Sequence, residues 1–337
     1  MVYTSVIPFL TLCLLSLQVI AAQAEEQWIT FKPEDGPGNG RHIVLVSGDD
    51  EYRSEETLPM LAKILSRHHG FKTTVLFAID PESGEITPDH QTNIPGLEHL
   101  RDADLMILCI RFRELPNRQM RYFDEYVQSG KPVIGIRTAT HAFRFERNPD
   151  NRYRKYDFRS EVPGWEGGFG QQILGETWTG HHGDHGTEAT RALRNGIMVR
   201  QDHPVIRGVS DIWVPTNVYG VLNLERDSDV LLWGQSTRGK KQDAPLIWEK
   251  PVMPIAWTRY YTSENGNTGR VFTTTMGSSV DFLSEDLRRL LVNASYWALQ
   301  MEDAIPEKSN AEIVGEYNPT MYGFDDYIRG LRPADYK

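Results

Sequence analysis

Short apolar runs separated by helical patterns fill residues 42–136, and this alternation leaves few folds open to the chain. A few apolar residues bounded by Gly or polar residues are typical of a buried strand, whereas apolar residues three and four apart indicate a helix. The order strand, helix, strand, strand, helix, strand is typical of a doubly wound, mostly parallel α/β sheet. The patterns predict strands at 42–47, 72–78, 104–110 and 133–136, a helix that Ser54 caps and Gly70 ends, and a helix at 116–128.

The second half of the chain is richer in β patterns, and we expect it to complete the sheet. A polar, irregular stretch at 144–170 is interpreted as an insertion over the edge of the sheet. Ser284 is expected to cap a last helix at 285–300. Between these segments the patterns predict strands at 197–200, 212–214, 230–234, 245–248, 253–260 and 269–275.

The first residues have the pattern of an export signal. Residues 6–22 are apolar and uncharged, and Ala22-Gln23-Ala24 matches an A-x-A cleavage site. We therefore expect a signal peptide at 1–24 and a periplasmic or secreted protein. The alternative, a membrane anchor, is disfavoured because Pro8 and several polar residues interrupt the run.

The composition of the remaining chain indicates its domain boundaries and the partners that it excludes. Gly and Pro at 25–40 indicate a linker, 41–300 is expected to form one domain, and the aromatic residues of 301–337 indicate an arm that packs on it. The net charge of −10 argues against a nucleic-acid partner, and no later run suggests a membrane partner after cleavage. Cys109 is the only cysteine beyond residue 24 and lies in a predicted strand, which favours a buried structural thiol. The oligomeric state stays open.

Polar residues follow the predicted strands at what should be one edge of the sheet. Arg137, Thr138 and His141 come directly after the strand at 133–136, where open α/β sheets bind ligands. The alternative is an ordinary helix start. Glu51 and Glu55 follow the first strand and could bind sugar hydroxyls or transfer protons, or could belong to a solvated acidic loop.

A glycine-flanked loop carries three histidines, His181, His182 and His185. With Asp184 they could hold a divalent metal, could share in a ligand site without metal, or could bond only to backbone and solvent. Trp178 precedes the loop, where its face is suited to stacking on a sugar ring, although core packing is the alternative.

Three stretches resemble the ThuA-like (trehalose utilisation) family of the class I glutamine amidotransferase-like superfamily. They are Ala139-Thr140-His141-Ala142-Phe143, His203-Pro204-Val205 with Gly208, and the run from Gly269 to Gly277. The resemblance covers about 41–300 and implies a flavodoxin-like sheet and a role in sugar utilisation. Amidotransferases have a nucleophilic Cys two residues after the glycine at the position of Gly135, and Arg137 stands there instead. The resemblance therefore argues against glutaminase chemistry.

These features lead to one main hypothesis and two alternatives. The main hypothesis is an exported enzyme that acts on a saccharide or keto-saccharide by acid/base chemistry. The sequence identifies no cofactor for it, apart from the divalent metal that the loop at 181–185 could hold. His141, His182 and His185 would transfer protons, and the substrate would contact Arg137, Thr138, Glu51, Glu55 and Trp178. The alternatives are a non-catalytic carbohydrate-binding protein and a metal-dependent hydrolase. The sugar and the reaction stay open.

Overall fold

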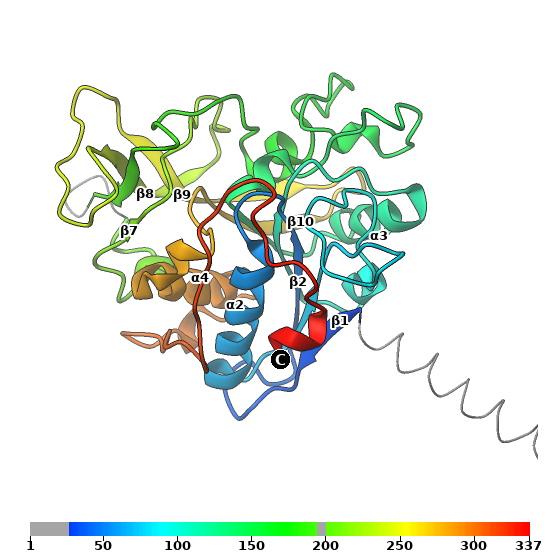
Figure 1. Cartoon of the computed structure of the whole chain (residues 1–337), viewed down its shortest axis with the longest axis horizontal. Helices are drawn as coiled ribbons and strands as arrows, with labels where there is room; N and C mark the ends of the chain where they lie inside the picture. Colours follow the sequence, from blue (N-terminus) through cyan, green and yellow to red (C-terminus); the bar gives the residue numbers. More distant parts are fainter. Residues whose placement is uncertain (1–26, 194–199) are drawn as a thin grey trace, which may run out of the picture.

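The computed structural model describes residues 27–193 and 200–337, and a mixed sheet runs through its centre (Figure 1). Within the described residues the sheet has ten strands in the order β1-β3-β2-β4-β5-β10-β9-β8-β6-β7. The strands are β1 (Trp28–Phe31), β2 (His42–Gly48), β3 (Lys72–Leu76), β4 (Leu105–Ile110), β5 (Val133–Ile136), β6 (Ala189–Ala192), β7 (Trp213–Val214), β8 (Asp229–Thr237), β9 (Met253–Thr262) and β10 (Thr268–Thr274). The longer helices are α2 (Ser54–His69), α3 (Asn117–Gln128) and α4 (Glu285–Ala298).

The sheet divides into a parallel and an antiparallel half. β3, β2, β4, β5 and β10 run parallel to one another. β1 adds to one edge in the antiparallel direction, and β9, β8, β6 and β7 continue the other side antiparallel. The predicted α/β class is thus confirmed. The expected mostly parallel sheet holds for the first half of the sheet only, because the β-rich second half of the chain adds β9, β8, β6 and β7 antiparallel.

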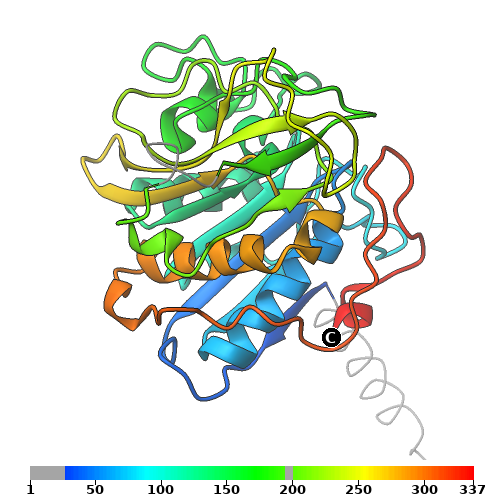
Figure 2. The same ribbon diagram turned by 90° about the vertical axis from the view of Figure 1, so that its left-hand side faces the viewer.

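Helices cover both faces of the parallel half, which explains the apolar runs of β2, β4 and β5. Figures 1 and 2 show α2 and α4 side by side on one face and α3 on the other. In β2, Ile43 and Leu45 pack toward α2 and α4, whereas Val44 and Val46 pack toward α3. Alternate residues of one strand therefore belong to two separate cores.

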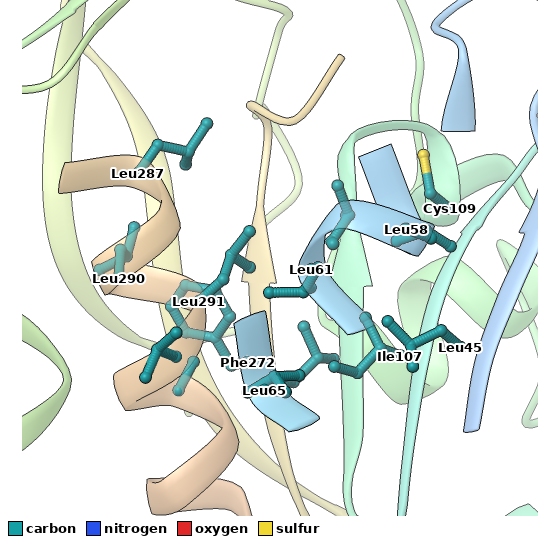
Figure 3. Packing of buried hydrophobic residues seen from close by; sticks show 14 of the residues in the cluster. Leu45, Leu58, Leu61, Leu65, Ile107, Cys109, Phe272, Leu287, Leu290 and Leu291 are labelled. Atoms are coloured by element: carbon teal, nitrogen blue, oxygen red, sulfur yellow. The ribbon is translucent and has the colours of Figure 1, made fainter. Parts of the chain in front are cut away.

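The core between the sheet and its α2/α4 layer consists of interleaved apolar side chains (Figure 3). Those labelled in the figure are fully buried, so each removes its apolar surface from water on folding. The residues labelled in the figure are Leu58, Leu61 and Leu65 of α2, Leu287, Leu290 and Leu291 of α4, and Leu45, Ile107, Cys109 and Phe272 of the sheet. Cys109 lies wholly inside β4, as predicted, and burial raises the pKa of its thiol.

Several local expectations need correction. Residues 25–40 were expected to be a linker, but Trp28–Phe31 form β1 because they pair with β3. The expected strand at 245–248 is reduced to a single bridge between Leu246 and Thr237. Strand β6 was not predicted. The predicted signal peptide and most of the strand at 197–200 lie outside the described residues.

The two predicted serine caps have different outcomes. Ser284 is the N-cap of α4 and accepts a hydrogen bond from the backbone N–H of Leu287. Ser54 does not cap α2, because its hydroxyl oxygen accepts the backbone N–H groups of Gly48 and Asp49 instead. Ser54 thereby shapes the loop that follows β2. Gly70 ends α2 in the left-handed conformation, as predicted.

The segment after α4 returns along α2 and reaches the edge of the sheet (Figure 2). Near its start, the Asn310 carbonyl oxygen lies 2.7 Å from His69 Nε2 at the end of α2. Further on, the backbone N–H of Thr320 donates to the Glu56 carboxylate at 2.8 Å, in the first turn of α2. Over residues 27–193 and 200–337, no helix combines the length and apolarity needed to cross a bilayer.

The core at α2 gives a direct test of this architecture. Leu61→Ala should lower the free energy of unfolding by about 2–5 kcal/mol, because it leaves a cavity among fully packed side chains. Leu283→Ala is the matched control, since the Leu283 side chain is 57% exposed, and its effect should stay within about 0.5 kcal/mol. Urea denaturation of both variants measures the difference, and equal effects would contradict the described core.

Candidate functional site

The order of the parallel strands places a crevice beside β2. The chain passes from β2 to β3 on one side and then to β4 on the other side of β2. In open α/β sheets, a reversal of this kind leaves a crevice at the carboxyl ends of the strands. The segments that follow β2, β4 and β5 meet there, as the sequence suggested.

A cavity of about 390 Å³ opens at this edge. This volume is at the small end of the range typical of pockets for small molecules. Its wall contains Asp50, Glu51, Tyr52, Arg111, Phe112, Arg137, Thr138, His141, Trp178, His181, His185, Tyr219 and Phe324. Of the predicted site residues, Glu51, Arg137, Thr138, His141, Trp178 and His185 line the cavity, whereas Glu55 and His182 do not.

The carboxylate of Asp49 holds two walls of the cavity together. Its Oδ1 accepts the backbone N–H groups of Glu51 and Tyr52, at 2.7 and 2.6 Å. Its Oδ2 accepts the hydroxyl of Thr138. The loop after β2 is thereby joined to the turn after β5. The predicted substrate contact Thr138 lines the cavity, but its hydroxyl is committed to Asp49.

Glu51 lies at the floor of the cavity and uses both carboxylate oxygens. Oε2 pairs with the Arg111 guanidinium, and Oε1 lies 2.8 Å from Nε2 of His185. Arg111 also donates through Nε to Asp50, at 2.6 Å. Burial raises the pKa of Glu51, while the Arg111 charge opposes that shift. The result is a carboxylate fixed between a cation and an imidazole.

All three histidines of the cavity have a pKa below the usual value for an imidazole. Burial lowers the pKa of His141 well below its usual value, and the charges of Arg111 and Arg137 add to this. Burial also lowers the pKa of His181 and of His185. All three imidazoles are therefore neutral near pH 7, the form that accepts a proton.

The contact between His185 and Glu51 favours one tautomer of the imidazole. With Nε2 directed at the Glu51 carboxylate, the ring proton is favoured on Nε2, and the lone pair then resides on Nδ1. In the described part of the chain, Nδ1 has no hydrogen-bond partner. The ring stacks near Tyr52 and Tyr322, with centroid distances of 6.1 and 5.5 Å. These contacts hold the imidazole in place.

Arg137 lines the cavity, and its guanidinium bonds to other parts of the protein. Its guanidinium donates through Nη1 to the carbonyl of Thr275 at 2.6 Å and through Nη2 to Asn217 Oδ1 at 3.0 Å. It also lies 4.0 Å from the Tyr52 ring centroid. Its terminal nitrogens thus bond to the protein, although Arg137 was expected to contact a substrate. Arg137 instead supports Tyr52 and the loops around it.

The backbone at Arg137 is also unusual. Its φ of 48° lies in the left-handed region, which side chains other than Gly seldom adopt. The Tyr219 hydroxyl donates to the Arg137 carbonyl at 2.8 Å and helps to fix the turn. Such strain clusters at functional sites. It marks the same turn that the sequence singled out.

Aromatic rings form the other part of the wall. Trp178 lies 5.0 Å from His141 and 5.5 Å from His181, measured between ring centroids. Phe112 also lies near His141, with 5.3 Å between the ring centroids. Arg111 and Phe112 follow β4 at the same edge, and no sequence motif pointed to them. Tyr52 and Tyr219 had no sequence signal beyond their residue type, and Phe324 was expected only as part of an aromatic arm.

The two predicted residues that miss the cavity have other surroundings. Glu55 is buried in the first turn of α2, and neither carboxylate oxygen bonds to another residue. Burial raises its pKa to about 8, so the carboxyl is protonated at neutral pH. His182 lies beside Lys250, whose Nζ donates to the His182 carbonyl at 3.3 Å. The prediction that both line the site is not met.

The histidine loop does not present a ready set of metal ligands. In the described ranges, no three His, Cys, Asp or Glu side chains are grouped so that they could hold a metal ion. Asp184, the expected carboxylate ligand, accepts the backbone N–H groups of Gly186 and Thr187 and the hydroxyl of Thr187. That carboxylate stabilises its own loop.

The chain is thus an α/β protein with a polar, aromatic-lined cavity at the carboxyl edge of its mixed sheet. The chain belongs to the ThuA family, whose description is trehalose utilisation and whose match spans residues 42–298. The family resemblance noted from the sequence motifs is thus confirmed. A comparison with curated proteins returned no match.

Solved structures show weaker likenesses. A ThuA-like protein from Parabacteroides merdae ATCC 43184 is 17% identical, with 88% of this chain and 99% of that chain covered and a TM-score of 0.44. The mmIFT52 N-terminal domain is 12% identical, with coverages of 77% and 97% and a TM-score of 0.36. An exo-β-1,4-mannosidase from Opitutaceae bacterium strain TAV5 is 11% identical, with coverages of 79% and 36% and a TM-score of 0.33. The family match carries the assignment.

The protonated Glu55 carboxyl predicts a pH-dependent stability. Between pH 4.5 and about 8 an unfolded chain releases this proton and the folded chain keeps it, so rising pH favours unfolding. Glu55→Gln removes this penalty, and its thermal midpoint should rise relative to wild type through that window and level off above it. Thermal melts at intervals from pH 5 to 9 measure the gap.

The matched control for this experiment is Glu82→Gln, at an exposed position. It should leave the wild-type pH profile in place, because it removes a carboxylate that the fold does not bury. A gap between Glu55→Gln and wild type that stays constant with pH would contradict a buried, protonated Glu55.

Proposed function

We propose that the cavity binds a saccharide or keto-saccharide and that the His185–Glu51 pair transfers a proton on it. The observation that carries this proposal is the buried Glu51 carboxylate, which lies 2.8 Å from His185 Nε2 and pairs with Arg111 on its other side. A carboxylate on one ring nitrogen orients a histidine and stabilises the imidazolium that forms when the other nitrogen takes a proton. With Nε2 of His185 held by Glu51, Nδ1 is the nitrogen that can accept a proton.

The chemistry is proton transfer without a covalent intermediate. His185 Nδ1 would accept a proton from a sugar hydroxyl, or from the carbon beside a keto group, and return it at the end of the turnover. Positioned acids and bases of this kind contribute about 10²–10⁴-fold in rate. Cys109 is buried in β4 and Arg137 occupies the turn after β5, so the proposal excludes glutaminase chemistry.

A sugar is the ligand class that the remaining wall supports. Trp178 offers an aromatic face beside His141, and pyranose rings stack on such faces. Polar groups that suit hydroxyls, including His141 and His181, lie next to it. The family description, trehalose utilisation, agrees with a sugar ligand. The acidic net charge of −10 supports a small neutral ligand over nucleic acid.

The strand order β3-β2-β4-β5-β10 also supports a flavodoxin-like winding of the amidotransferase-like type for the parallel half.

The proposal also includes export of the protein, which the apolar run at 6–22 and the Ala22-Gln23-Ala24 site support. Mass measurement of protein recovered from its native compartment should give a chain that starts after Ala24. A chain that retains Met1 would contradict export with cleavage.

A non-catalytic carbohydrate-binding protein is the second candidate. It is favoured by the absence of a nucleophile at Arg137 and by guanidinium groups whose terminal nitrogens bond to protein atoms. The two candidates differ in product formation. Incubation with disaccharides and their keto forms, followed by product analysis, separates an enzyme from a protein that only binds.

The histidine loop supplies a matched pair of variants. His185→Ala should lower turnover by about 10²–10⁴-fold, because it removes the proton acceptor. His182→Ala, three residues earlier and outside the cavity, should retain near wild-type turnover. Steady-state rates on any sugar that the screen identifies measure both.

The pH profile provides a further readout. Because burial and nearby cations lower the pKa of His185, activity should persist below pH 6.5 and decline only as the imidazole becomes protonated. Equal losses in His185→Ala and His182→Ala, with unchanged thermal midpoints, would rule out the assignment of His185.

A further inference from the structure

One part of the cavity wall comes from outside the residues that match the family. The match ends at residue 298, yet Phe324 lines the cavity. Gly323 is fixed against the loop after β2, because its backbone N–H donates to the Glu51 carbonyl at 2.9 Å. Its carbonyl accepts from Arg53 Nη2 at 2.6 Å. Phe324 therefore starts from a backbone position that is tied to Glu51.

Tyr322 anchors the same segment on the other side. Its hydroxyl donates to the Pro215 carbonyl at 3.2 Å and accepts from Lys240 Nζ at 2.5 Å. Its ring lies 5.3 Å from Tyr52 and 5.5 Å from His185, between centroids. Tyr322 and Gly323 are thus both held in place by hydrogen bonds, directly before Phe324.

Phe324 differs from most aromatic residues of the chain because it is exposed. Its side chain is 59% exposed, although it belongs to a cavity wall. The Arg111 guanidinium lies 4.6 Å from its ring centroid, and the same guanidinium pairs with Glu51. A cation over one face positions the ring without burying it. The ring keeps apolar surface open to solvent or to a ligand.

The cavity has a buried floor and an open rim. Glu51 and His141 are 3% and 4% exposed, so they form the floor. Phe324 stands at the rim, one side chain away from Glu51 through Arg111. A ligand that reaches Glu51 and extends outward passes this ring. Aromatic faces in such positions stack on the apolar face of a second ring.

We propose that Phe324 forms an outer subsite that stacks on the second ring of a di- or oligosaccharide whose first ring lies at Glu51 and His185. The inference rests on the proposed function and adds the size class of the substrate. It assigns a specificity-determining role to the segment after residue 300. A single sugar ring would bind at the floor without needing Phe324.

The test compares one-ring and two-ring probes in the full chain. Trehalose, maltose and cellobiose, each against glucose, are titrated calorimetrically into wild type and Phe324→Ala. Wild type should bind at least one disaccharide more tightly than glucose. Phe324→Ala should weaken that disaccharide by about tenfold, the scale of one aromatic stacking contact, and leave glucose unchanged. Phe324→Tyr should restore most of the affinity, because it keeps the ring face.

Met321→Ala is the matched control, since Met321 is a comparably exposed side chain of the same segment but lies outside the cavity wall. It should change neither affinity. Thermal midpoints of all variants report whether the segment stays in place.

Three outcomes overturn the inference. An unchanged disaccharide affinity in Phe324→Ala rules out stacking. An equal loss for glucose and disaccharide shows that Phe324 acts by supporting Arg111 instead. Both results leave the proposed sugar site standing. A wild-type chain that binds none of the four sugars overturns the proposed function and this inference together.

Discussion

The carboxylate of Asp49 is the interaction on which the cavity depends. It is fully buried directly after β2, and its two oxygens join the loop after β2 to the turn after β5. A buried carboxylate is costly unless hydrogen bonds replace its water, and here two backbone N–H groups and a hydroxyl do so. The same bonds set the position of the Glu51 and Tyr52 backbones. Glu51, Arg111 and His185 can meet only because this junction is fixed.

The parallel half of the sheet could be predicted closely from the sequence. Its strands are buried on both faces, so they form compact apolar runs that stand out from the helices between them. The strands at the two edges of the sheet were harder to predict from the sequence. Trp28–Phe31 form β1 through pairing with β3, and nothing local in a Gly- and Pro-rich stretch indicates that partner. The residues at 245–248 have a strand pattern but only one bridge, because pairing depends on distant geometry.

The candidate site could be predicted in position and only partly in detail. The rule that ligands bind beyond the carboxyl ends of parallel strands singled out Arg137, Thr138 and His141, and all three line the cavity at that edge. It could not reveal that the Arg137 guanidinium bonds to Asn217 and Thr275, which are far away in the sequence. In the histidine loop, sequence spacing did not distinguish His182 from His185, because a glycine-rich loop has no fixed periodicity. Glu55 has the same difficulty, since it is close in sequence to Glu51, which lines the cavity, but lies in the first turn of α2 and is buried outside the cavity wall.

The contact between Arg53 and Gly323 joins residues 270 positions apart in the chain. Closing a loop of that length costs conformational entropy that local contacts do not repay, so such contacts tend to form late in folding. During synthesis, the sheet and its helices can assemble while the outer wall of the cavity is still missing. The cavity is completed only after residues 322–324 have emerged from the ribosome. Chains that have not yet reached residues 322–324 would therefore have a folded sheet with an unfinished cavity wall.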